Sequence, residues 1–417
     1  MAAVHRLMAL GVGLYVATVG FRIATALAAV HLGLSPAEIG LVLATFALVP
    51  MLFAVPGGRW VDRVGVRRPM RLGAALCLAG ALACSLVLHP LGLVATAGLV
   101  GLGMMVFHLG LQHAAGEMGG AGRRTANFNL LTMAFSISGL IGPALVGVTI
   151  DWAGHQAAFA TTAVLLGLVL FGVGRFRFER HLPKTAPDSR AAPGPATDAS
   201  VAGATPAAPD NDAVPPSPAR DATARPRAAS TFSLLGAPRL RRLLIASLLA
   251  SAAWDTFQFA MPLHGGTIGL SATAVGLALS SYSAGSLFVR LLLPRLLARM
   301  APARWMKVAL VSCVLAYAAV PYATGYTVLI ALAFLIGMGP GIAQPLLMAA
   351  LHGASPAGRA GEAAGLRLTL LSAMQLAVPI GLGLLATVAG SASLFWTYAA
   401  VTGGLGAWLA WVQRRGG

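Results

Sequence analysis

Long apolar stretches alternate with short polar breaks along most of this chain. About twelve of these stretches approach the roughly 20 mostly apolar residues that a helix needs to cross a membrane, and short Gly, Pro or Arg clusters separate them. Hydrophobic residues make up 57% of the 417 positions and charged residues only 10%, which is far from the composition of a soluble domain. The pattern predicts an all-α membrane protein with twelve transmembrane helices.

The basic residues lie on one side of the predicted helices. With the N-terminus inside, six turns face outward and contain neither Lys nor Arg: residues 31–38, 89–92, 151–156, 264–271, 321–327 and 389–393. The opposite turns and the C-terminal end carry Arg59, Arg63, Arg67, Arg68, Arg71, Arg123, Arg124, Arg295, Arg299, Arg304, Lys307, Arg414 and Arg415. Basic turns stay in the cytoplasm, so we expect a multi-pass protein of a bacterial-type inner (plasma) membrane with both termini cytoplasmic. This topology explains the net charge of +17, and nucleic acid is not an expected partner.

The second part of the chain repeats the first at a constant offset, the one that takes Gly33 to Gly269. The same offset pairs Gly40 with Gly276, Arg63 with Arg299, Cys77 with Cys313, Pro143 with Pro379 and Gly147 with Gly383. Six helices per half predict two parallel repeats, residues 1–178 and 231–417. Residues 179–230 between them are mainly Ala and Pro, which predicts a disordered cytoplasmic linker. We expect it to act as a tether, and a regulatory role stays open.

A charged motif follows the predicted second helix. It reads Gly-Arg-Trp-Val-Asp-Arg-Val-Gly-Val-Arg-Arg, with its distinctive positions at Gly58, Asp62, Arg63, Gly65, Arg67 and Arg68. The motif resembles the signature loop of the major facilitator superfamily, and the two-half repeat adds to this resemblance. The resemblance implies a gating loop in which Asp62 latches the two halves on the cytoplasmic side by facing a helix N-terminus. The second copy has Ala298 where Asp62 stands, so only the first loop is expected to latch.

The predicted fifth helix contains a second motif, residues 139–147, with the sequence Gly-Leu-Ile-Gly-Pro-Ala-Leu-Val-Gly. It resembles part of the glycine–proline motif of family antiporters, although Ser138 replaces one further glycine. Small residues at this spacing are also typical of close helix packing, which is the reading we favour. Drug antiporters of the family carry an arginine early in the fourth helix, whereas Ala97 and Gly98 occupy that region here. Drug efflux is therefore the less favoured function.

Charged residues deep in the membrane are costly and usually functional, and two stand out. Arg22 and Asp255 lie well inside predicted helices, each on a stripe of polar residues at helical spacing. The full set of candidate residues for substrate binding or proton coupling is Arg22, His108, Gln112, Asp255, Gln258 and Gln344. The resemblance implies that they face the central cavity, which the first, fourth, seventh and tenth helices line in this family. Arg290 and Arg367 are expected instead to extend toward cytoplasmic water.

The leading functional prediction is secondary active transport of a small solute by alternating access, coupled to protons. An arginine in the cavity suits an anionic or polar metabolite. Proton-driven efflux of amphipathic compounds and a membrane sensor without transport are the alternatives. The chain shows no phosphate-binding loop and no catalytic motif, so we expect no enzyme activity, no cofactor and no metal. The expected partners are a small-molecule substrate, protons and membrane lipid, and the chain is expected to act as a monomer.

Overall fold

The computed structural model describes residues 2–118, 124–176, 235–323, 325–354 and 360–415. The predicted linker, residues 179–230, lies outside them. The helices are α1 (Ala2–His31), α2 (Pro36–Val64), α3 (Arg67–Leu86), α4 (Pro90–Glu117), α5 (Arg124–Arg175), α6 (Pro238–Thr267), α7 (Ala272–Arg299), α8 (Pro302–Ala319), α9 (Tyr326–Ala354), α10 (Ala360–Ala389) and α11 (Ala392–Arg415), with a 3₁₀ turn η4 at Val320–Tyr322.

Element α5 is two helices joined at a sharp turn. Its 52 residues are interrupted at Gly154, whose φ of 86° and ψ of 174° are not helical. A φ in this range favours glycine because it has no Cβ. Splitting α5 at this point gives twelve helices in the described part of the chain, as predicted. Ten elements are long and apolar enough to span a membrane, and one of them, Met133–Arg175, contains both parts of α5.

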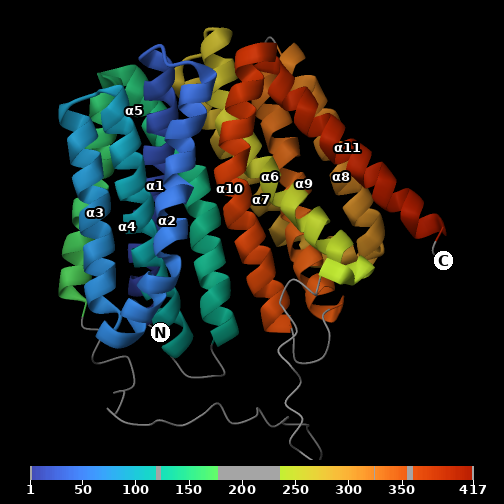
Figure 1. The fold of residues 1–417 in the computed structure, drawn as a ribbon, viewed down its shortest axis with the longest axis horizontal. Helices are drawn as coiled ribbons and strands as arrows, with labels where there is room; N and C mark the ends of the chain where they lie inside the picture. The colour runs from blue at the N-terminus through green and yellow to red at the C-terminus, as the bar shows by residue number, and fades with distance from the viewer. Residues whose placement is uncertain (1, 119–123, 177–234, 324, 355–359, 416–417) are drawn as a thin grey trace, which may run out of the picture.

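The helices form two halves side by side, α1–α5 and α6–α11 (Figure 1). Successive helices run in opposite directions, so the six turns without Lys or Arg fall at one end, which we call the arginine-free end. The other end, with the N-terminus and the basic clusters, is the arginine-rich end (Figure 1). Many large apolar side chains are exposed on the outside, among them Leu168, Phe171 and Leu315. A multi-pass membrane protein would cover this surface with lipid.

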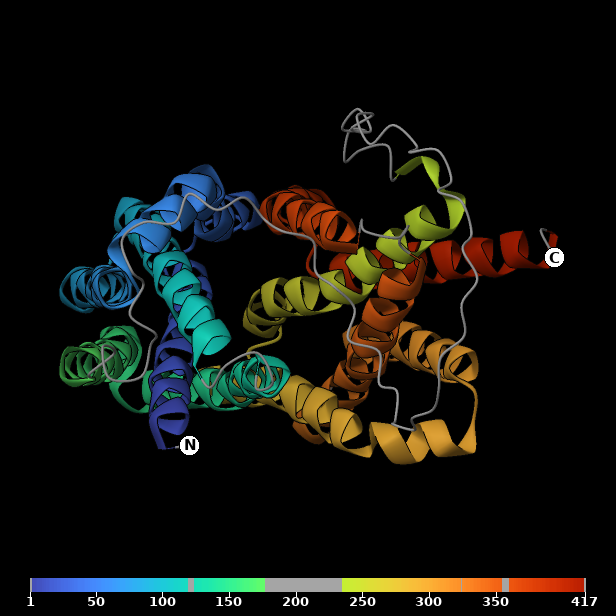
Figure 2. The same ribbon diagram turned by 90° about the horizontal axis from the view of Figure 1, so that it is seen from below.

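Two seams between the halves show the internal repeat directly. At one seam α2 packs on α10, and at the other α5 packs on α7; the seams lie on opposite sides of the molecule (Figure 2). A Cβ on Gly40 would overlap the carbonyl oxygen of Pro379, and a Cβ on Gly276 would overlap that of Pro143. The repeat offset relates these two contacts, because it takes Gly40 to Gly276 and Pro143 to Pro379. The repeat therefore places glycine against backbone at both seams.

The signature motif begins inside a helix rather than after it. Helix α2 continues to Val64, so Gly58 and Asp62 lie in its last turns and the expectation that the motif follows the helix was wrong. Gly65 alone makes the turn, with a φ of 76°. Arg67 then donates a 2.8 Å hydrogen bond from Nη2 to the carbonyl oxygen of Gly174 in α5. This contact joins the start of α3 to the C-terminal end of α5.

Candidate substrate cavity

A cavity of about 430 Å³ lies between the two halves. Residues of α1, α2, α4 and α6 form most of its wall, and Phe135 of α5 and two residues of α10 complete it. The glycine contact at Gly40 is four residues from the start of α2, whereas the α2 residues in the wall, 46–51, begin six residues further along. At 1.5 Å per residue the cavity starts about 9 Å beyond that contact. It therefore lies on the arginine-rich side of the closed seams.

Arg22 enters the cavity from α1. Its guanidinium carbon lies 5.9 Å from the centre of the Phe46 ring, a distance at which a cation is attracted to an aromatic face. Its Nε is buried and has no hydrogen-bond partner. A buried guanidinium donor without an acceptor is unfavourable, so the site suits a ligand that supplies an anionic or carbonyl oxygen.

Asp255 and Gln258 enter the same cavity from α6, one helical turn apart. Both are almost completely buried, with 4% and 3% of their surfaces exposed, and Oε1 of Gln258 has no hydrogen-bond partner. The charges of Asp255 and Arg22 lie close enough to interact, but no hydrogen bond or ion pair joins them directly in the described part of the chain. The cavity thus brings together a cation, a carboxylate and an unpaired amide oxygen.

His108 lines the cavity from α4 and has a partner on each ring nitrogen. Nδ1 hydrogen-bonds to the hydroxyl of Tyr15, and Nε2 lies 2.7 Å from the amide nitrogen of Gln112. If the Gln112 amide donates, Nδ1 carries the hydrogen and donates to Tyr15, which leaves the imidazole neutral. Tyr15 is fully buried, with its ring centre 4.3 Å from that of Phe135. Tyr15 and Gln112 therefore fix the orientation of the imidazole.

Two predicted site residues lie away from the cavity wall. Gln112 contacts the Nε2 atom of His108 but does not line the cavity. Gln344 accepts a 2.7 Å hydrogen bond from Nη2 of Arg290. Arg290 also donates from Nη1 to Ser136 of the other half, at 3.2 Å. Arg367 donates to the hydroxyl of Ser247. The expectation that Arg290 extends to water was wrong, because polar groups on neighbouring helices hold both of its terminal nitrogens within the bundle. Arg367 is partly exposed, and only its Nε makes this contact.

The sequence analysis missed the apolar part of the wall and one polar edge. The larger residues among those missed are Phe46, Met51, Met104, Met105, Phe135 and Trp254, and the polar ones are Ser372 and Gln375. Ser372 and Gln375 are polar residues three apart in an apolar helix, a signal that could have identified them. The methionines and aromatic residues carry no such signal, since apolar side chains are common on every face of a membrane helix.

The arginine-free end is closed by backbone contacts and by one carboxylate. A Cβ on Gly147 of α5 would overlap the carbonyl oxygen of Ala272. One turn further, Asp151 accepts hydrogen bonds from the backbone N–H groups of Ala272, at 3.0 Å, and Thr273, at 2.7 Å. The glycine–proline motif also packs on α1, where a Cβ on Gly142 would meet the carbonyl oxygen of Val16. Close packing, the favoured reading of this motif, is what the geometry supports.

The comparisons with known proteins agree with this geometry. The sequence profile of the Major Facilitator Superfamily matches residues 7–379 and 243–416. No curated protein matches the chain at the sequence level. A solved mutant form of the nucleoside transporter NupG has a TM-score of 0.72 at 13% identity, covering 98% of this chain and 99% of that one. A POT family transporter in complex with 5-aminolevulinic acid gives 0.71 at 13%, with 98% and 95% covered.

A third similar structure is a bacterial homologue of the human lysosomal transporter Spinster, solved inward-facing and unoccupied. It gives a TM-score of 0.70 at 14% identity and covers 97% of this chain and 94% of that one. At such identities the structural likeness shows the fold alone, while the sequence profile covers most of the chain. This chain belongs to the major facilitator superfamily.

Proposed function

We propose that the chain is a secondary active transporter that moves a small anionic or polar metabolite by alternating access, coupled to protons. The family supports transport in general, and the absence of a phosphate-binding loop from the sequence supports gradient-driven energy. The positive-inside rule supports an inner-membrane location with the arginine-rich end in the cytoplasm. In this orientation the structure is an inward-facing state, since the closed seams lie at the external end.

The observation that carries the proposal is that polar atoms without hydrogen-bond partners line the same cavity as Arg22. Its Nε has no partner, Gln258 Oε1 has none, and Asp255 lies nearby as a buried carboxylate. A solute with an anionic group would bind Arg22 and release Asp255 from its attraction to that charge. Asp255 would then take up a proton, because the charged carboxylate is no longer stabilised, so solute binding and protonation would be coupled through one cavity. Asp62 is proposed to latch the cytoplasmic side in the opposite state.

One observation favours the efflux alternative. The cavity wall contains Met51, Met104, Met105, Phe46 and Trp254, and flexible methionines beside aromatic rings adapt to apolar ligands of different shapes. A substrate with both an anionic group and an apolar body would use all of this wall. Compounds of that kind belong in the same assay as simple metabolites.

The test is uptake into vesicles that contain the purified full-length protein. Labelled carboxylates, nucleosides, short peptides and amphipathic anions are offered with and without an imposed pH gradient. We expect at least one anionic compound to accumulate only with the gradient, and Arg22→Gln to abolish this accumulation. Arg299→Gln, at an exposed arginine outside the cavity, is the matched control. Accumulation by Arg22→Gln equal to that of the control would contradict the role of Arg22.

A further inference from the structure

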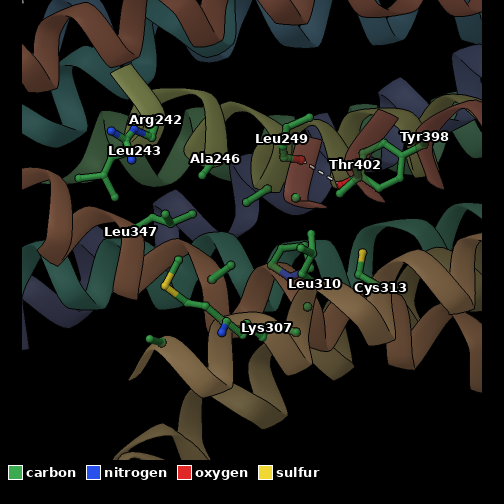
Figure 3. Close-up of a pocket in the computed structure, with 18 residues that line it drawn as sticks. Arg242, Leu243, Ala246, Leu249, Lys307, Leu310, Cys313, Leu347, Tyr398 and Thr402 are labelled. Atoms are coloured by element: carbon green, nitrogen blue, oxygen red, sulfur yellow. Dashed lines mark hydrogen bonds between the residues drawn. The ribbon is translucent and has the colours of Figure 1, made fainter. Parts of the chain in front are cut away.

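A second cavity, of about 250 Å³, lies within the C-terminal half and shares no residue with the central one. It is a groove lined by residues of α6, α8, α9 and α11 (Figure 3). In Figure 3 Arg242, Leu243 and Leu249 border it on one side and Lys307 and Leu310 on the other. The groove is therefore separate from the solute pathway.

The groove has apolar walls and a cationic mouth. Leu243, Leu249, Leu310 and Leu347 line it, and none of its 18 lining residues is acidic. Its two charged residues are Arg242, at the start of α6, and Lys307, near the start of α8. The apolar α6 residues in the wall run from Leu243 to Ala250, so the apolar part extends about 10 Å along the helix. The two charges thus lie on opposite walls toward the arginine-rich end, and the rest of the lining is uncharged.

The two cations lack anionic partners. Nε of Arg242 donates to the carbonyl oxygen of Pro238 in its own helix, at 3.2 Å, and no hydrogen bond or ion pair holds Lys307 within the described residues. Lys307 is exposed. The mouth lies at the arginine-rich end, where the basic turns of a membrane protein meet the headgroups of the cytoplasmic leaflet. That leaflet contains anionic lipids, which attract basic side chains near the surface.

We propose that this groove binds one anionic phospholipid, with its phosphate between Arg242 and Lys307 and an acyl chain along α6 and α8. A soluble phosphate compound would contact the two cations but leave the apolar wall, about 10 Å long, uncovered. A neutral lipid would fill the wall but leave both cations unpaired. An anionic phospholipid satisfies both parts, and basic recesses between membrane helices are known binding places for such headgroups.

The experiment measures lipid binding to the full-length protein by native mass spectrometry in neutral detergent. Phosphatidylglycerol and phosphatidylcholine with identical acyl chains are compared, and glycerol 3-phosphate is added as a soluble competitor. We expect phosphatidylglycerol to bind more tightly, and Arg242→Gln with Lys307→Gln to weaken it roughly 25-fold, since each cation near an anionic lipid contributes roughly fivefold. The control is Arg295→Gln with Arg299→Gln, which removes two charges from the same end but not from the groove.

A second variant tests the apolar part. Ala343→Phe places a ring in the groove from α9 and is expected to weaken phosphatidylglycerol binding while both cations remain. If the double variant does not fold, Lys307→Gln alone, at an exposed side chain, gives the same comparison at roughly fivefold. Equal loss in the groove variant and the control would overturn the proposal. So would unchanged binding by Ala343→Phe, or competition by glycerol 3-phosphate at the concentration of the lipid, because either result would leave the apolar wall without a role.

Discussion

The carboxylate of Asp151, at the end of the fifth helix, accepts a 2.7 Å hydrogen bond from the backbone N–H of Thr273, at the start of α7 in the other half. The first N–H groups of a helix have no partners within it and carry partial positive charge, so a carboxylate there is doubly favourable. The bond joins the halves at the arginine-free end. It also has no equivalent at the other seam, since the repeat offset takes Asp151 to Thr387, whose hydroxyl donates within its own helix to Gly383.

Asp151→Ala is therefore expected to favour opening at the arginine-free end. Loss of a helix-capping side chain costs about 1 kcal/mol, which corresponds to a roughly fivefold shift in the ratio of the two states. Spin labels at Val87 and Val388, which are exposed on the two halves, would report the change as a longer distance. The three native cysteines are buried, so labelling is confined to the introduced positions. Thr387→Ala is the control, and an equal shift there would contradict the latch.

Asp62→Ala is expected to act in the opposite direction. In the proposed function Asp62 holds the cytoplasmic side closed, and its counterpart in the second repeat is already Ala298. The variant should shorten the mean distance between labels at Val87 and Val388 by reducing the population open at that end. Combined with Asp151→Ala it should restore a distribution near that of the parent. A longer distance in the single variant would show that Asp62 has a different role.

A large side chain in place of a glycine at the seams should prevent the arginine-free end from closing. A Cβ on Gly276 has no room beside the carbonyl oxygen of Pro143, so Gly276→Leu should push α7 away from α5 and trap the arginine-free end open. Transport should fall at least tenfold, because alternating access needs both states. Gly167→Leu is the control, since a Cβ there meets no atom within 4 Å. Normal transport by Gly276→Leu would mean that the seam need not close as tightly as in this structure.

The central charges are tested by single and double replacement. Removing either Arg22 or Asp255 leaves the other as a buried charge with no opposite charge in the same cavity, which is unfavourable, so both single variants should lose transport. If the two charges only held α1 and α6 together, Arg22→Gln with Asp255→Asn would restore it. We expect the double variant to fold, as judged by its melting temperature, yet remain unable to accumulate solute with a pH gradient. Near-normal accumulation would remove both residues from the proposed mechanism.

Tyr15→Phe tests the support of His108. The change removes the partner of Nδ1 and leaves a buried polar atom unsatisfied, which costs about 1 to 3 kcal/mol. The melting temperature should fall by several degrees, and a bound substrate should raise it less than in the parent protein. Tyr322→Phe, at a tyrosine that is 73% exposed, should leave both quantities unchanged. Equal effects from the two variants would argue against a specific role for Tyr15.

The features that could be predicted from the sequence are those set by the cost of placing backbone polar groups or charged side chains in lipid. Each spanning helix must satisfy its own hydrogen bonds, so the twelve helices follow from runs of apolar residues, and their alternation places the arginine-free turns at one end. The cost of a charge in the membrane likewise identified Arg22 and Asp255, and both line the cavity. These features depend on the position of a residue along one helix.

Features that depend on contacts between two helices could not be predicted in this way. Arg290 lies where its long side chain could reach water, but Ser136 of α5 and Gln344 of α9 hold it inside. Met104 and Trp254 face the cavity rather than lipid, and an apolar side chain has the same hydropathy in either place. The choice depends on helix rotation, which small residues such as Gly101 fix through contact with α2.

The two seams differ in how they meet the cavity. The α5–α7 seam is joined by hydrogen bonds at Asp151 and at Ser136, two positions that lie about 22 Å apart along α5. Among the described residues α7 contributes nothing to the cavity wall, whereas Met51 of α2 and Gln375 of α10 both line it. The cavity therefore borders the α2–α10 seam on both of its helices, but borders the α5–α7 seam on α5 alone. Under the proposed function, solute in the cavity would touch α2 and α10 but not α7, so substitutions on the cavity side of α2 and α10 are expected to change solute binding more than substitutions on α7.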